Sequence, residues 1–229
     1  MIRRVNLRDL PNATVFNNAE LAIILPDQIV STAIAETNAY DITAFGLGTG
    51  ESISTEIVGQ MKWIYCLEGQ LEVTFNDQSV DLTAGFAIIL NRDCRHAIRA
   101  KSKASFQQIH LYQTKENRPM INKIPHNETI RLADQIEMIT NRKTSKSLVQ
   151  HETLTLTLFA LDAGQQIARH TATGDALVQI LDGEALITID QTEYTVKKGE
   201  SIVMPAEIPH ALEAVEAFKM LLTVVKPGE

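Results

Sequence analysis

The sequence predicts an all-β chain that forms two tandem β-barrels. Two observations carry this prediction: a repeat with an offset of 114 residues, and short apolar runs that are broken by Gly, Asp and Pro turns. The length of 229 residues agrees with it, because domains of about 100–150 residues are the commonest size. We therefore expect one barrel duplicated within the chain.

The repeat is defined by three glycines and a histidine at invariant spacing. In each half, these residues are separated by 19, 16 and 11 positions. The first half carries Gly50, Gly69, Gly85 and His96. The second half carries Gly164, Gly183, Gly199 and His210. Constant spacing without a gap indicates an internal duplication.

The strands are predicted from β-rich runs between turn residues. In the second half these runs are residues 154–161, 176–181, 185–189, 194–196 and 201–204, and in the first half they include 63–67, 71–75 and 87–90. Short runs with turn signals every 8–12 residues are typical of a sandwich or barrel. Residues 113–129 are polar and predict a linker between domains 1–112 and 130–229, and residues 130–140 predict a short helix that opens the second domain.

This arrangement resembles a bicupin, which contains two copies of the cupin jelly roll (double-stranded β-helix). The first cupin motif is G-x5-H-x-H-x3-4-E-x6-G and the second is G-x5-P-x-G-x2-H-x3-N. The second half matches their spacing with Gly164, His170, Ala172, Ala176, Gly183, Gly199, Pro205, Glu207, His210 and Ala214. The first half matches with Gly50, Glu56, Val58, Lys62, Gly69, Gly85, Asn91, Asp93, His96 and Ala100. The resemblance covers about residues 40–111 and 154–225 and implies the fold, but cupins have many activities.

The second half holds the candidate metal site that the resemblance implies. His170 and His210 stand at ligand positions, whereas Ala172 and Ala176 replace the second histidine and the glutamate. With Asp175, the two histidines would give a set of two imidazoles and one carboxylate for a divalent metal such as Fe, Mn, Ni or Zn. Asp175 meets this role only if its strand starts late or bulges, because adjacent strand residues face opposite sides. A metal-free polar pocket is an equal expectation.

The apolar wall of a pocket in the second half is predicted from strand parity. Val178, Ile180 and Met204 lie beside the motif positions and would face the barrel interior. Together with the two histidines, they suggest a binding site for a small molecule.

The first half reads as a degenerate copy of this site. Glu56 and Lys62 occupy ligand positions and could form a buried ion pair, and His96 is the surviving histidine. Parity places Cys66 on the cavity side, which suggests either a thiol or metal site with His96 or a small buried apolar residue. Trp63 and Tyr65 are expected on the outer face, and this half is expected to be structural.

Composition narrows the partners and the compartment. The net charge of −7 and the pI of about 5.4 argue against nucleic acid and against anionic membranes. Apolar runs are too short to cross a bilayer, and the basic start of the chain has no apolar segment of a secretory signal. We expect a cytoplasmic protein, either a monomer with an internal pseudo-dimer or a homodimer.

Three functions are compatible with these features. The first is a bicupin that binds a small molecule in its C-terminal barrel, with or without a weakly held divalent metal. The second is a metal-dependent enzyme of the dioxygenase, decarboxylase or sugar isomerase type that uses His170, His210 and Asp175. The third is a structural or interaction protein whose barrels have no accessible cavity.

Overall fold

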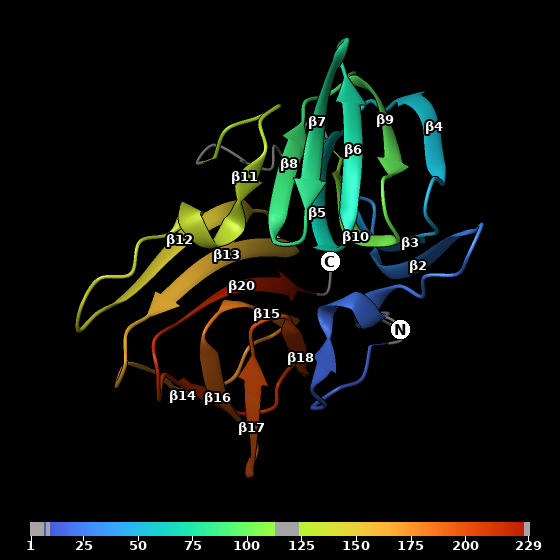
Figure 1. Cartoon of the computed structure of the whole chain (residues 1–229). Coiled ribbons are helices and arrows are strands. Elements are labelled where there is room, and N and C mark those ends of the chain that lie inside the picture. Colours follow the sequence, from blue (N-terminus) through green and yellow to red (C-terminus); the bar gives the residue numbers. More distant parts are fainter. Residues whose placement is uncertain (1–6, 8–9, 113–123, 227–229) are drawn as a thin grey trace. The chain divides into compact units, whose positions relative to one another are not determined.

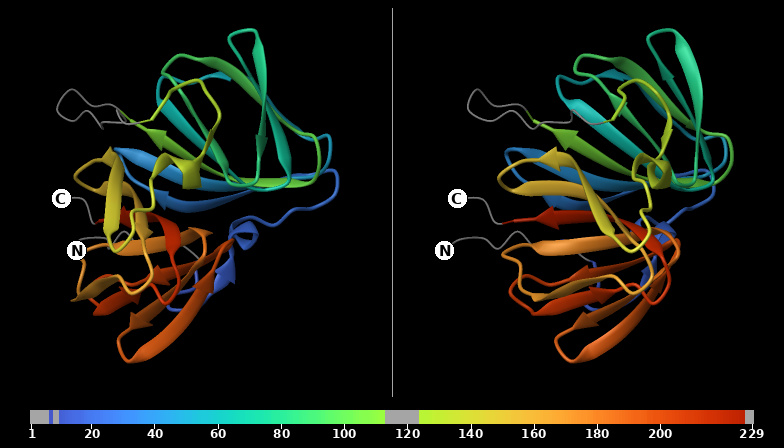
Figure 2. Two further views of the ribbon diagram at one scale, coloured as in Figure 1. Left: turned by 60° about the vertical axis from the view of Figure 1, so that its left-hand side comes forward. Right: turned by 90° about the vertical axis from the view of Figure 1, so that its left-hand side faces the viewer.

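The computed structural model describes residue 7 and residues 10–112 and 124–226 (Figure 1). Almost all of its regular structure is β, as predicted, and the described strands form two jelly-roll barrels, each made of a six-stranded and a four-stranded sheet. Figure 2 shows the two sheets of each barrel facing one another. No helix within the described residues is long and apolar enough to cross a membrane.

The N-terminal barrel pairs its strands in the order of a jelly roll. Its six-stranded sheet runs β11 (Ile130–Arg131), β8 (Phe86–Leu90), β5 (Met61–Glu68), β10 (Ala104–Leu111), β3 (Tyr40–Leu47) and β2 (Ile29–Glu36). Its four-stranded sheet runs β4 (Ser52–Ile57), β9 (Arg95–Ala100), β6 (Gln70–Phe75) and β7 (Gln78–Thr83).

The C-terminal barrel repeats this order with strands shifted by 114 residues. Its six-stranded sheet runs β1 (Phe16–Asn17), β18 (Glu200–Met204), β15 (Asp175–Asp182), β20 (Phe218–Val225), β13 (Leu154–Leu161) and β12 (Lys143–Gln150). Its four-stranded sheet runs β14 (Gln166–His170), β19 (His210–Glu213), β16 (Glu184–Ile189) and β17 (Thr192–Lys197).

The leading segment of each repeat joins the barrel formed by the other repeat. Phe16 of β1 pairs with Ser201 of β18, and the equivalent Ile130 of β11 pairs with Ala87 of β8. The described residues up to Asn18 therefore group with the C-terminal barrel, and residues 125–132 group with the N-terminal barrel. This differs from the predicted division into 1–112 and 130–229, and most of the predicted linker, residues 113–123, lies outside the described residues.

Short helical segments follow these leading strands. They are two 3-10 helices, η1 (Asn18–Leu21) and η2 (Leu132–Gln135). The helix predicted over residues 130–140 is therefore wrong in extent, because its first two residues pair with β8 as a strand and only one 3-10 turn follows.

The repeated glycines mark turns that other residues would strain. Gly69 and Gly183 have φ angles of 76° and 74°, in the left-handed region that glycine tolerates. A Cβ atom would lie 2.0 Å from the carbonyl oxygen of Lys103 at Gly69 and 2.2 Å from that of Ala217 at Gly183. Close backbone approach therefore explains why the two copies share this position.

Each barrel interior is filled by residues at alternate strand positions. In the N-terminal barrel, Ile64 and Cys66 belong to the core, as parity predicts, and in the C-terminal barrel Val178 and Ile180 do the same. Trp63 and Tyr65 occupy the intervening positions and are buried as well.

Candidate functional site

A cavity of about 240 Å³ lies inside the C-terminal barrel beside the two predicted histidines. It is bounded by strands of both sheets, and its wall is mostly apolar. The lining residues are Lys143, Phe159, Ile167, His170, Ala172, Ala176, Met204, His210, Leu212, Met220, Leu222 and Val224. An apolar cavity with a few polar groups is the usual form of a small-molecule site.

His170 and His210 are brought together by the pairing of β14 with β19. The two residues are cross-strand partners, and their ring centroids lie 4.6 Å apart with the planes at 65°. Nδ1 of each ring lies 2.9 Å from a backbone carbonyl oxygen, that of Ala168 for His170 and that of Ile208 for His210. Because a carbonyl oxygen only accepts, each Nδ1 carries the proton of this hydrogen bond, and Nε2 is the ring nitrogen that remains for other contacts.

The protonation of His210 is set mainly by its surroundings. Burial lowers the pKa of His210 below its usual value, the Ile208 carbonyl acts to raise it, and His170 lowers it further. The ring of His210 is buried, whereas His170 is exposed. At neutral pH His210 is therefore held as a neutral imidazole.

The structure does not bring Asp175 to the histidines. Its Oδ1 accepts a hydrogen bond of 2.8 Å from the backbone N–H of Ala206, and its Oδ2 accepts one of 3.2 Å from that of Leu7. The neighbouring Ala176 lines the cavity, so strand alternation turns Asp175 to the opposite side. The predicted ligand set of His170, His210 and Asp175 is therefore wrong in its third member. The Asp175 carboxylate accepts hydrogen bonds from backbone N–H groups on the side of the strand that faces away from the cavity.

The remaining donors do not fit a resident metal. No group of three or more His, Cys, Asp or Glu side chains in the described part of the chain is placed to hold a metal ion. Two imidazoles are fewer than the three protein ligands of a typical catalytic site.

The predicted apolar wall is correct in part. Met204 lines the cavity, whereas Val178 and Ile180 belong to the buried core of this barrel and are not among the lining residues. Ala176 and Val224, which were not predicted, also line the cavity. The last strand of each repeat was not included in the predicted wall. Strand alternation in residues 218–225 nevertheless places Leu222 and Val224 on the cavity side.

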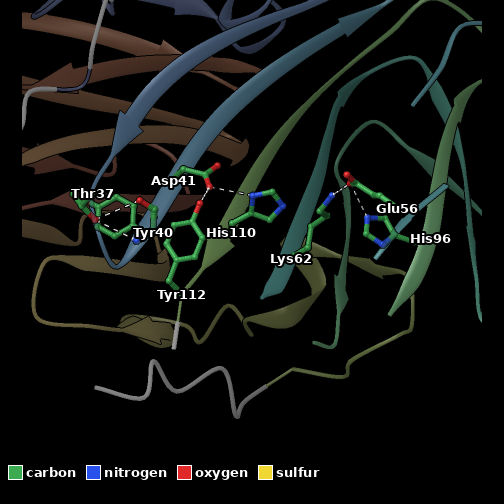
Figure 3. A network of polar contacts seen from close by, with 8 residues as sticks. All are labelled: Thr37, Tyr40, Asp41, Glu56, Lys62, His96, His110 and Tyr112. Carbon is green, nitrogen blue, oxygen red and sulfur yellow. Dashed lines mark hydrogen bonds and ion pairs between the residues drawn. The ribbon is translucent and has the colours of Figure 1, made fainter. Parts of the chain in front are cut away.

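The N-terminal barrel contains a polar network at the equivalent place (Figure 3). The Oε1 atom of Glu56 accepts a hydrogen bond from Nζ of Lys62 and lies 3.1 Å from Nε2 of His96. The Lys62 side chain is 1% exposed and that of Glu56 is 38% exposed. The predicted ion pair of Glu56 and Lys62 is confirmed, and His96 joins it.

Burial and pairing oppose one another in this network. Burial lowers the pKa of Lys62, and the Glu56 carboxylate acts to raise it. Burial acts to raise the pKa of Glu56, but Lys62 and His96 bring it below its usual value. Burial lowers the pKa of His96, against the effects of the Cys94 carbonyl and of Glu56. Pairing therefore offsets part of the cost of burying Lys62 and Glu56.

A second polar cluster adjoins the first and was not predicted. Nδ1 of His110 lies 3.0 Å from Oδ2 of Asp41, and the Tyr112 hydroxyl donates to the same oxygen. His110 is the cross-strand partner of both Asp41 and Lys62, so the clusters are neighbours on one sheet face (Figure 3). Alignment of the two repeats contains a signal for this cluster. His110 stands where the other repeat has the apolar Val224, so a polar residue occupies an interior position.

Cys66 does not take part in these contacts. Its Sγ lies 3.4 Å from the carbonyl oxygen of Glu68, and burial raises the pKa of its thiol to about 12. Because the thiolate is the reactive form of cysteine, Cys66 acts as a buried apolar residue.

A more polar hollow of about 290 Å³ lies on the N-terminal barrel. It is lined by Thr55, Thr74, Phe75, Asn76, Asp77, Arg95, His96 and Ala97. Of the described residues of the buried network, His96 is the one that lines this hollow.

Comparison with known proteins places both barrels in one family. The sequence model described as "Cupin domain" matches residues 46–112 and 157–226. The solved structure of a cupin 2 conserved barrel domain protein from Leptotrichia buccalis is similar with a TM-score of 0.82 and 29% sequence identity, over 96% of this chain and 100% of that chain.

Two other proteins are similar at a greater distance or over a shorter length. A salicylate 1,2-dioxygenase from Pseudaminobacter salicylatoxidans has a TM-score of 0.59 at 15% identity, over 83% of this chain and 72% of that chain, which shows a shared fold alone. "Uncharacterized protein MJ1618" of Methanocaldococcus jannaschii is 37% identical over 43 residues. That match spans 19% of this chain and 34% of the relative, about a third of its length.

Proposed function

The chain belongs to the cupin family, and from this premise we propose that its C-terminal barrel binds a small, largely apolar molecule. The observation that carries the proposal is the cavity of about 240 Å³ beside His170 and His210. A mostly apolar space within a barrel supports a binding role, because protein interiors are normally close-packed.

The cavity volume limits the size of the ligand. Engineered apolar cavities of about 150 Å³ bind benzene, and sites for drug-sized molecules begin at about 300 Å³. The C-terminal cavity lies between these values, which supports a ligand of about one ring or a short branched chain.

Duplication supports assigning the binding role to this barrel. Where the N-terminal barrel places Lys62 and His110, the C-terminal barrel has Ala176 and Val224. The larger side chains occupy the interior of the first barrel, and the smaller ones line the cavity of the second. The N-terminal barrel is accordingly proposed to be a structural partner.

An enzymatic role has less support from the same residues. The metal-dependent alternative needs Asp175 at the histidines, and its carboxylate binds Leu7 and Ala206 instead. Binding without a metal uses the groups that do meet at the cavity.

The proposal is tested with benzyl alcohol as a neutral probe. In protein labelled with ¹³C at the methionine methyl groups, benzyl alcohol is expected to shift the signals of Met204 and Met220, which line the cavity. Met61 of β5 in the other barrel is the internal control. The variant Ala176→Leu narrows the cavity and is expected to weaken the response at least fivefold. Unchanged Met204 and Met220 signals at millimolar probe would refute the proposal.

A further inference from the structure

Within the described part of the chain, the titratable residues that line the C-terminal cavity are Lys143, His170 and His210, and no carboxylate lines it. Lys143 lies on the edge strand β12, and its Nζ donates a hydrogen bond of 2.9 Å to the carbonyl oxygen of Gln166 on the edge strand β14. The Lys143 side chain therefore lies between two edge strands that belong to different sheets and do not pair through their backbones. A cavity whose ionisable groups all gain positive charge favours an anion.

The N-terminal barrel contains an internal example of the same recognition. His96 and His210 are equivalent, and both rings are fixed by a hydrogen bond of 2.9 Å from Nδ1 to the carbonyl oxygen two residues earlier. Nε2 of His96 then lies 3.1 Å from the carboxylate of Glu56. The repeated histidine thus presents its Nε2 edge to a carboxylate in one barrel.

In the C-terminal barrel, no carboxylate of the described residues is hydrogen-bonded to this edge. Residue 170 is a histidine where the first repeat has Glu56, and residue 176 is an alanine where it has Lys62. His170 and His210 each form a hydrogen bond through Nδ1 to a backbone carbonyl oxygen two residues earlier in the chain. A carboxylate from a ligand would replace the one that Glu56 supplies internally.

From these observations, and resting on the proposed function, we propose that the ligand of the C-terminal barrel is a small carboxylic acid whose carboxylate binds at the Nε2 edges of His170 and His210. Its apolar body fills the space beside Ala176, Met204 and Val224. Because each Nδ1 already donates to a carbonyl oxygen, an Nε2 that donates to the carboxylate belongs to an imidazolium ring. Binding therefore takes up a proton from solvent when the ring was neutral.

The test compares benzoate with benzyl alcohol, which have similar apolar bodies and differ in charge. Both are titrated at pH 6.0 and at pH 8.0, and the methyl signals of Met204 and Met220 are recorded. At pH 6.0 benzoate is expected to bind at least tenfold more tightly than benzyl alcohol. At pH 8.0 the affinity for benzoate is expected to fall at least fivefold, while that for benzyl alcohol stays within twofold.

The matched variant is His170→Asn/His210→Asn, because an asparagine amide can still donate to the carbonyl oxygen that Nδ1 contacts. It is expected to lower the affinity for benzoate at pH 6.0 much more than that for benzyl alcohol, so that the preference for benzoate falls to within threefold. Equal binding of the two probes to the unaltered chain, or a preference that survives in the double variant, overturns the carboxylate proposal and leaves the proposed function standing. Absence of binding by both probes overturns the proposed function itself.

Discussion

Lys62 and Ala176 hold the same position in the two barrels, and each pairs with equivalent residues on both flanking strands. The Lys62 side chain is buried and reaches Glu56, whereas Ala176 lines the cavity. The N-terminal barrel is therefore filled by the Lys62–Glu56 ion pair at the position where the C-terminal barrel has a cavity. This relationship gives a direct way to convert one state into the other.

Introducing the lysine into the C-terminal barrel is expected to close the cavity at a cost in stability. Ala176→Lys buries an ammonium group without a counter-ion, which we expect to destabilise the protein by about 3 kcal/mol. His170→Glu/Ala176→Lys supplies the carboxylate found in the first repeat and is expected to recover at least half of that loss. Thermal unfolding followed by circular dichroism measures both effects, with His170→Glu alone as the control. A double variant no more stable than Ala176→Lys would contradict the equivalence.

The reverse experiment concerns the buried pair of the N-terminal barrel. Glu56→Gln leaves the ammonium group of Lys62 buried without its counter-ion and is expected to cost about 3 kcal/mol. Glu56→Gln/Lys62→Met removes both charges, and a pair replaced by packed apolar groups is commonly close to neutral. Urea unfolding monitored by Trp63, which neighbours Lys62 in β5, reports on this barrel. The idea fails if the double variant is less stable than Glu56→Gln.

The fold could be predicted from the sequence because the spacing of glycines and strands in one half recurs in the other half, and this repetition makes the β-barrel pattern specific. The spacing shared by Gly69 and Gly183 reflects a turn that admits no Cβ atom in either copy. The exchange of leading segments could not be predicted, because β1 and β11 are two residues long and carry no periodicity. Their pairing depends on tertiary placement rather than on local sequence.

The site was predictable where a motif spacing fixed the strand position, as for His170 and His210. The prediction that Asp175 is a ligand was wrong because adjacent strand residues face opposite sides, and the neighbouring Ala176 faces the cavity. The cluster of Asp41 and His110 was missed because the two residues are 69 positions apart and lie outside the motifs. Only the register of β3 with β10 brings them together.

Acid is expected to destabilise the protein through His210. Its pKa is lowered in the folded protein, mainly by burial, so below about pH 6.5 the unfolded chain binds this proton more readily than the folded chain. The contribution is fully present above that pH and is lost as the pH falls toward the lowered pKa. His210→Asn removes this titration, and the slope of stability between pH 7 and 5.5 should become shallower, by at most about 1.4 kcal/mol per pH unit.

The comparison must allow for other histidines. The pKa of His96 and that of His151 are lowered as well, chiefly by burial, so the variant keeps part of the dependence. The measured quantity is therefore the difference in unfolding free energy between variant and unaltered chain at each pH, from urea titrations. A difference that does not change between pH 7 and 5.5 would show that His210 titrates alike in both states.

The last prediction separates a structural from a ligand-binding role of Asp175. Its carboxylate accepts one backbone N–H on each oxygen, and hydrogen bonds to charged groups contribute about 1.5–3 kcal/mol. Asp175→Asn keeps one acceptor and replaces the other by a donor, so we expect a loss of about 2 kcal/mol in stability. Benzyl alcohol is expected to bind the variant within twofold of the unaltered chain, since the side chain faces away from the cavity. Urea unfolding and the Met204 signal measure the two quantities on one sample. Normal stability together with loss of probe binding would place Asp175 at the ligand and contradict the structure.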